Sequence, residues 1–159
     1  MNKSCGCPEL NKEDWELKKH DWNKRAFYRT KHLLFLHMPI GIGKAITKGM
    51  DKIKAKGYTV KPPYMMLDDE TGKFSANMLI AIEEMPAGDP DVIIWEPTTL
   101  YSKYYHGPFK GLKKEIDELM AFVEKQEKQK ANRLYTWVTN CPKCWKEQGG
   151  PTTIIFARV

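Results

Sequence analysis

Apolar positions along the chain form two long stretches with helical spacing, each preceded by a short apolar or aromatic run. The first stretch steps by four, four and three residues, at Ile42, Ile46, Met50 and Ile53. This spacing places the four side chains on one face of an amphipathic helix. We expect that helix to end near Gly57, because glycine suits a left-handed stop. The apolar run before it, residues 33–37, has the length of a buried strand.

The second helical stretch carries a longer apolar stripe, made of Phe109, Leu112, Ile116, Leu119, Met120 and Val123. It predicts a helix that ends near Gln129 and follows an aromatic strand over residues 101–106. Both strands meet their helix at a His-x-Pro sequence, which begins at His37 in one copy and at His106 in the other. Further strands are predicted at residues 64–67, 76–84, 92–96, 134–139 and 152–159.

The order strand, helix, strand, strand therefore occurs twice. We expect an α+β fold built as a tandem pseudo-twofold repeat of two β-α-β-β modules, with a mostly antiparallel sheet and two main helices. The first module covers about 33–85 and the second about 92–159, within one domain over 33–159. Residues 1–32 are polar with scattered aromatic side chains, and we interpret them as an N-terminal arm. The seam between two such modules is a common place for a ligand pocket.

Charge and hydropathy narrow the possible partners. Lys and Arg number 26 against 20 Asp and Glu, a net charge of +6. Much of this excess lies around the first predicted helix, which carries no aromatic side chains, so we expect a solvated helix face and no nucleic-acid partner. No apolar stretch approaches the ~20 residues of a membrane span. The start lacks the apolar core of a secretory signal, and we expect a cytoplasmic protein without a membrane partner.

The four cysteines form two short pairs, Cys5-x-Cys7 and Cys141-x-x-Cys144. In a chain that is not secreted, such residues are thiols, thiolates or metal ligands rather than a disulfide framework. The Cys-Pro-Lys-Cys turn has the shape of a zinc knuckle, and four thiolates would complete a tetrahedral site if the arm folded back. The sequence favours two reduced pairs, with the second at the rim of the pocket. We therefore assign no metal ligand and no cofactor.

One family resemblance rests on residues 104–112, Tyr-Tyr-His-Gly-Pro-Phe-Lys-Gly-Leu, followed by the second helix. This segment resembles the strand-to-helix signature of the GyrI-like small-molecule-binding family, and the CPxC turn between the last two strands resembles a stand-alone branch. The resemblance covers residues 33–159. It implies two modules around a central pocket for organic ligands, and a branch that hydrolyses cyclopropane-bearing electrophiles. Many members carry Glu-x-Tyr after the second helix, whereas residues 135–137 here read Tyr-Thr-Trp, without a carboxylate.

Candidate site residues follow from these patterns. Aromatic and thioether side chains on strands can stack on flat ligands, and we expect the ligand-binding set to be Tyr64, Met66, Trp95, Tyr105, Tyr135 and Trp137. The alternative for each of them is a role in filling the core. Acid–base chemistry requires a carboxylate near the pocket. Glu96, between Trp95 and Pro97, and Glu147, after the cysteine turn, are the catalytic candidates, and solvated surface roles remain the alternative for both.

The sequence thus supports a stand-alone binding protein with a central aromatic pocket for apolar organic ligands, electrophilic or xenobiotic ones included. A hydrolase of reactive electrophiles in the same pocket is the alternative from another class. A structural protein held together by its cysteines is the third hypothesis.

Overall fold

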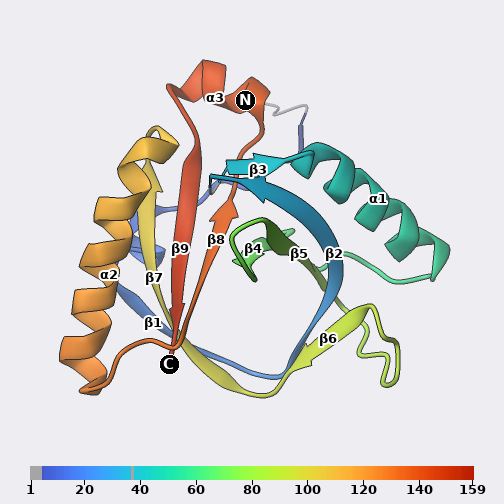
Figure 1. Ribbon diagram of the computed structural model, residues 1–159, viewed down its shortest axis with the longest axis horizontal. Helices are drawn as coiled ribbons and strands as arrows, with labels where there is room; N and C mark the ends of the chain where they lie inside the picture. Colours follow the sequence, from blue (N-terminus) through green and yellow to red (C-terminus); the bar gives the residue numbers. More distant parts are fainter. Residues whose placement is uncertain (1–4, 37) are drawn as a thin grey trace. The chain divides into compact units, whose positions relative to one another are not determined.

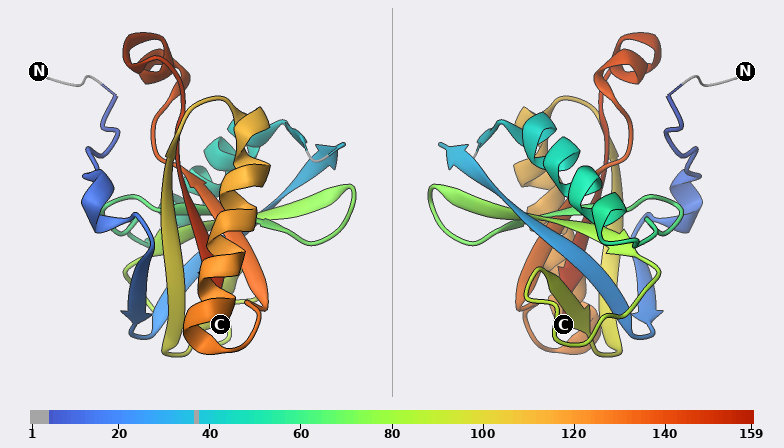
Figure 2. Two further views of the ribbon diagram at one scale, coloured as in Figure 1. Left: turned by 90° about the vertical axis from the view of Figure 1, so that its left-hand side faces the viewer. Right: turned by 90° about the vertical axis from the view of Figure 1, so that its right-hand side faces the viewer.

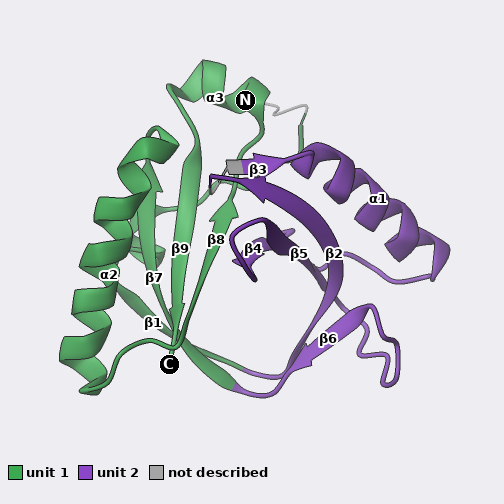
Figure 3. Cartoon of the chain, in the orientation of Figure 1, with its two compact units in different colours: residues 1–22, 98–159 green, residues 23–97 purple. Residues whose placement is uncertain are grey.

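The computed structural model describes residues 5–36 and 38–159, so His37 lies outside the described residues. The chain divides into two compact units (Figure 3). Unit 2 is the continuous segment Asn23–Pro97, whereas unit 1 combines Met1–Trp22 with Thr98–Val159. Each unit has its own set of paired strands and its own core cluster.

Unit 2 is an antiparallel sheet with one helix (Figure 1). Its elements are β2 (Arg25–Phe35), β3 (Met38–Ile40), α1 (Ile42–Ala55), β4 (Met66–Glu70), β5 (Ser75–Ile82) and β6 (Val92–Trp95). The strand order is β4-β5-β2-β3, and β6 also pairs with β2. The buried side chain of Ile53 on α1 joins a cluster with Tyr28 and Ile80 of the sheet, and Ile42 and Ile46 pack against it. The fourth residue of the predicted stripe, Met50, is exposed instead.

Unit 1 is also built from antiparallel strands, with one long and one short α-helix. Its elements are η1 (Lys12–Asp14), β1 (Lys18–Trp22), β7 (Thr98–His106), η2 (Phe109–Gly111), α2 (Leu112–Glu127), β8 (Arg133–Val138), α3 (Pro142–Gln148) and β9 (Thr152–Arg158). The order is β1-β7-β9-β8. α2 lies across one face (Figure 2), where Leu119 and Val123 pack on Tyr101 and Ile155.

The two units repeat one topology, which confirms the predicted α+β fold. In unit 2 the chain runs β2-α1-β4-β5, and the last strand, β5, pairs with both β2 and β4. In unit 1 it runs β7-α2-β8-β9, and again the last strand lies between the other two.

Three boundaries differ from the sequence prediction. β2 begins at Arg25, and β1 occupies residues 18–22, so much of the predicted arm at 1–32 is sheet. The strand predicted at 64–67 instead runs from Met66 to Glu70 as β4, because residues 66–70 pair in register with β5. The predicted cysteine turn continues into α3, which Pro142 can begin because a proline needs no donor in a first helical turn.

No helix among residues 5–36 and 38–159 combines the length and the apolar character needed to cross a membrane.

Candidate functional site

The face of the unit 1 sheet opposite α2 is rich in rings, and we call it the aromatic face. Side chains alternate along strands, so the contacts of Tyr101 and Ile155 with α2 place their strand neighbours on the other side. The register brings Tyr135 opposite Phe156, and Ile154 opposite both Trp137 and Tyr104. The aromatic face therefore comprises Tyr104, Tyr135, Trp137, Ile154 and Phe156.

The N-terminal segment covers part of the aromatic face. The Trp15 ring meets Trp137 edge-on at 5.8 Å between centroids and Phe156 at 5.9 Å. Its backbone is fixed because the buried Ser102 hydroxyl donates to the Trp15 carbonyl at 2.7 Å. The next residue, Glu16, accepts from the Tyr104 backbone N–H at 3.2 Å. Edge-to-face ring pairs of this kind stabilise packing beyond the buried area alone.

A hollow of about 290 Å³ lies at the α3 end of the aromatic face. It is lined by Pro8, Glu9, Leu10, Asn11, Tyr104, Thr139, Asn140, Gln148 and Thr152, all of unit 1. Three hydrogen bonds of the Asn140 side chain hold the rim of the hollow. The amide nitrogen donates to Gln148 at 3.0 Å. The amide oxygen accepts from the Trp145 ring at 2.9 Å and from the Thr152 backbone at 2.8 Å. The hollow is thus a rigid, polar-rimmed recess beside a ring-covered wall.

The predicted residues of unit 1 divide between the two faces. Tyr135 and Trp137 lie on the aromatic face and are buried. Tyr105 lies on the α2 side, where its hydroxyl donates to the Pro108 carbonyl at 2.8 Å. Its neighbour Tyr104, which the sequence does not distinguish from it, lines the hollow instead. Glu147 is exposed on α3 and is not among the lining residues.

The predicted residues of unit 2 do not converge on one place within that unit. Trp95 is buried and packs on Phe27 with 4.7 Å between ring centroids. Met66 packs against the unit 2 core, and Tyr64 is 51% exposed. The catalytic candidate Glu96 lies at the surface, where its side chain is 75% exposed and pairs with Lys24 at 3.3 Å.

Asp68 of unit 2 was not among the predicted site residues, and its side chain is only 20% exposed. Its oxygen lies 2.9 Å from Nε2 of His32, whose side chain is buried. Burial raises the pKa of the Asp68 carboxyl, and the hydrogen bond with His32 partly opposes that rise. A His–carboxylate pair of this kind can hold or move a proton.

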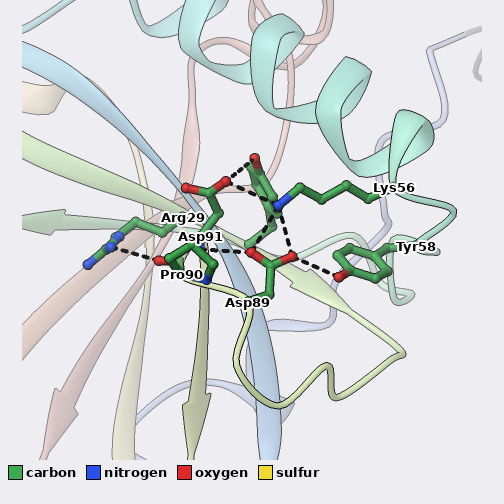
Figure 4. A network of polar contacts seen from close by, with 7 residues as sticks. Arg29, Lys56, Tyr58, Asp89, Pro90 and Asp91 are labelled. Atoms are coloured by element: carbon green, nitrogen blue, oxygen red, sulfur yellow. Dashed lines mark hydrogen bonds and ion pairs between the residues drawn. The ribbon is translucent and has the colours of Figure 1, made fainter.

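A second polar network in unit 2 fastens the loop between β5 and β6 to the end of α1 (Figure 4). Lys56 donates to both oxygens of Asp89 at 2.9 and 2.8 Å and to Asp91 at 3.1 Å. The Tyr58 hydroxyl also donates to Asp89, at 2.7 Å. Hydrogen bonding, from Lys56 above all, lowers the pKa of Asp89 to about 2. We call this network of Lys56, Tyr58, Asp89 and Asp91 the lysine clasp. Its ion pairs hold the loop against the end of α1.

All four cysteines come together in unit 1, where the sequence predicts two separate pairs. Their sulfur atoms all lie within 4.8 Å of one another, and we call this group, Cys5, Cys7, Cys141 and Cys144, the four-cysteine cluster. The backbone N–H of Cys7, followed by the thiol of Cys144, lowers the pKa of Cys5 to about 7. Thiol groups at this spacing are a potential set of metal ligands.

Three solved structures share this architecture at low sequence identity. The C-terminal domain of EcmrR superposes with a TM-score of 0.68 at 13% identity, covering 91% of this chain and 96% of that one. EcmrR in its complex with DNA gives 0.63 at 14% identity; the match spans 90% of this chain but 56% of that one. SAV2435 bound to tetraphenylphosphonium gives 0.51 at 10% identity, with 91% and 93% covered.

These likenesses define the fold as GyrI-like, which confirms the resemblance predicted from residues 33–159. The chain belongs to the family described as "Bacterial hydrolase", whose model matches residues 1–159. No curated protein matches the sequence.

Proposed function

We propose that this protein binds small, mainly apolar organic molecules in the hollow and against the adjoining rings of the aromatic face. The observation that carries the proposal is that Tyr104, which lines the hollow, lies on the same sheet face as Tyr135 and Trp137. Large rings with polar edges bind flat ligands by stacking and orient them by hydrogen bonds. The complex of SAV2435 with tetraphenylphosphonium supports the proposal, because that protein shares the fold and holds a molecule with aromatic rings.

The charges around the hollow favour neutral ligands over cations. No carboxylate occurs in the Tyr-Thr-Trp stretch at 135–137. Among the described residues that line the hollow, Glu9 is the acidic one, and it already has an interaction partner within the chain. A cation that entered the hollow would lose hydrating water, and Glu9 would have to give up its present partner to neutralise it. Both effects are unfavourable.

A paired titration tests both statements. The probes are the cation tetraphenylphosphonium and the neutral triphenylphosphine oxide. Isothermal calorimetry and tryptophan fluorescence measure how tightly each probe binds. We expect the neutral probe to bind at least as tightly as the cation. Tyr104→Ala should weaken binding roughly tenfold, the loss of one stacked ring. Tyr105→Ala is the matched control, since its ring lies on the other face. Equal losses in the two variants would contradict the placement of the site.

Hydrolysis of reactive electrophiles is a second proposed function, favoured by the family description over the whole chain. A water molecule would need a base within reach of the bound ligand. Glu147 is the candidate nearest in sequence to the hollow, because it precedes the lining residue Gln148. Glu96 and the Asp68–His32 pair lie in unit 2, and their substitutions test whether the chemistry takes place in that unit instead.

The experiment follows addition of water to a cyclopropane-bearing electrophile by liquid chromatography and mass spectrometry. Glu147→Gln, Glu96→Gln and Asp68→Asn each remove one candidate base with little change in shape. Loss of a general base lowers kcat by roughly 10²–10⁴-fold. We expect one of the three variants to show such a drop while the binding of triphenylphosphine oxide persists. Product formation no faster than in buffer would leave the protein a binder without hydrolase activity.

A further inference from the structure

We propose that the four-cysteine cluster is a structural Zn²⁺ site. A tetrahedral site with Zn–S bonds of about 2.3 Å has sulfur–sulfur edges of about 3.8 Å. In the cluster the Cys141 and Cys144 sulfurs lie 3.8 Å apart, and those of Cys5 and Cys144 lie 3.2 Å apart. All six separations fall within 4.8 Å, so one ion at the centre reaches every sulfur with small side-chain adjustments. This inference does not depend on the proposed function.

Backbone N–H groups donate hydrogen bonds to the sulfurs of the cluster. The Cys141 N–H donates to Cys7 Sγ at 3.3 Å. Cys5 Sγ accepts from the Cys7 backbone, and Cys141 Sγ accepts from the backbone of Lys143 and Cys144. These N–H groups point at three of the four sulfurs, as outer partners of metal-bound ligands do. A group of four thiolates would repel itself strongly without a cation, whereas Zn²⁺ neutralises two of the four charges.

The set of ligands selects the metal class. Four sulfurs in a tetrahedral arrangement suit Zn²⁺ or iron, and hard cations such as Mg²⁺ or Ca²⁺ prefer oxygen. All four positions are protein thiols, which is the closed arrangement of a structural zinc rather than an open catalytic one. Binding converts the thiols to thiolates and releases their protons to solvent, so the site forms more readily as pH rises.

The ion would join two segments that are distant along the chain. Cys7 immediately precedes Pro8, and Cys141 immediately follows Asn140; both of these neighbours line the hollow. Zn²⁺ would therefore fasten the N-terminal segment to the loop between β8 and α3. Removing the ion should release residues 8–11 before it affects the sheet, because β1, β7, β8 and β9 are held by their own ladders.

The test uses the full chain, purified under reducing conditions from zinc-supplemented medium. Native mass spectrometry and elemental analysis should show one Zn²⁺ per chain. Replacing the N-terminal pair, Cys5→Ser with Cys7→Ser, should weaken zinc binding more than about 100-fold. Lys146→Ala, an exposed substitution on α3, is the control and should retain the full complement of zinc. Hydrogen exchange should show faster exchange of residues 8–11 after chelation of the wild-type protein.

A titration of the reduced wild-type protein with Co²⁺ needs no variant and therefore does not depend on how the double substitution folds. Tetrahedral thiolate coordination gives intense sulfur-to-cobalt charge-transfer absorption, and we expect it to saturate at one equivalent and to be displaced by Zn²⁺. Absence of those bands from the folded, reduced protein would overturn the proposal. So would wild-type zinc affinity in the double variant, or iron in place of zinc in the purified protein.

Discussion

At the scale of single residues, one glycine in unit 2 sets how closely a helix approaches the sheet. Gly49 lies in α1, and a Cβ added there would stand 2.9 Å from Cδ1 of Ile80 and 3.2 Å from Cγ2 of Thr30. Both neighbours belong to the sheet, and Ile80 is buried. Gly43 lies in the same helix with nothing within 4 Å of the added carbon. The same alanine substitution would therefore add a methyl group to a crowded interface at Gly49 and to open space at Gly43.

We predict opposite effects of the two alanine substitutions on stability. Gly49→Ala gains about 1 kcal/mol of helix propensity but overfills the interface, which costs roughly 1–3 kcal/mol, so a net loss of about 1 kcal/mol is expected. Gly43→Ala should gain a few tenths of a kcal/mol up to about 1 kcal/mol. Urea unfolding followed by circular dichroism measures both. Stabilisation by both substitutions would show that α1 can move away from the sheet without cost.

Residue-level sites could be predicted only in part, and Tyr104 and Tyr105 show why. They are adjacent and chemically identical, so only the face that α2 covers decides which ring reaches the hollow. That face depends on contacts between Tyr101 and α2, which begins eleven positions later at Leu112, and no local pattern contains such contacts. Tyr135 and Trp137 were easier to place together, because the alternation of one strand puts them on the same side.

At the scale of elements, the amphipathic helices were predictable because a period of 3.6 residues is written directly in the chain. α1 and α2 begin within a few residues of the predicted starts. The acidic end of β4 and the helix α3 were not predictable in this way. The predicted strand stops at residue 67, whereas β4 continues to Glu70 because Asp69 and Glu70 pair with Asn77 and Ala76 of β5. α3 is too short for a period to show.

The lysine clasp predicts a specific pH dependence at this scale. The pKa of Asp89 falls from 3.8 to about 2 on folding, so the folded state binds that proton less readily than the unfolded state. The stabilisation is therefore complete above pH 3.8 and is lost as pH falls towards 2. Asp89→Asn should be less stable than wild type near neutral pH, and the difference should shrink across that acid window.

The matched control for the clasp is Asp117→Asn. Asp117 pairs with Lys113 at 2.8 Å on the surface of α2, where both side chains are well exposed. Exposed pairs of this kind contribute little. Chemical unfolding of the three proteins at several pH values between 2 and 7 gives the comparison. A difference between wild type and Asp89→Asn that does not change with pH would contradict the proposed role of the carboxylate charge.

At the scale of the whole molecule, unit 1 is assembled from both ends of the chain. β1 pairs with β7 from Lys18 opposite Ser102 to Trp22 opposite Thr98, across a long separation in sequence. The sequence showed the doubled topology because each copy carries its own pattern. It did not show that the polar first segment completes the sheet of the second copy, because that pairing is made by backbone groups and by a few aromatic side chains far apart in the chain.

Substitution of Trp22 tests that assembly directly. It should lower the free energy of unfolding strongly if β1 is a structural strand, and only slightly if the first segment is an accessory arm. The Trp22 side chain is 7% exposed and lies 5.4 Å from the Phe156 ring, edge-on. Trp22→Ala should therefore lower the free energy of unfolding by roughly 3–5 kcal/mol, as for a large core side chain. Phe74→Ala is the control, since Phe74 is 67% exposed, and its loss should remain below about 1 kcal/mol. Urea unfolding decides between the two: if both substitutions cost equally little, the first segment is an appendage, and unit 1 holds its core without it.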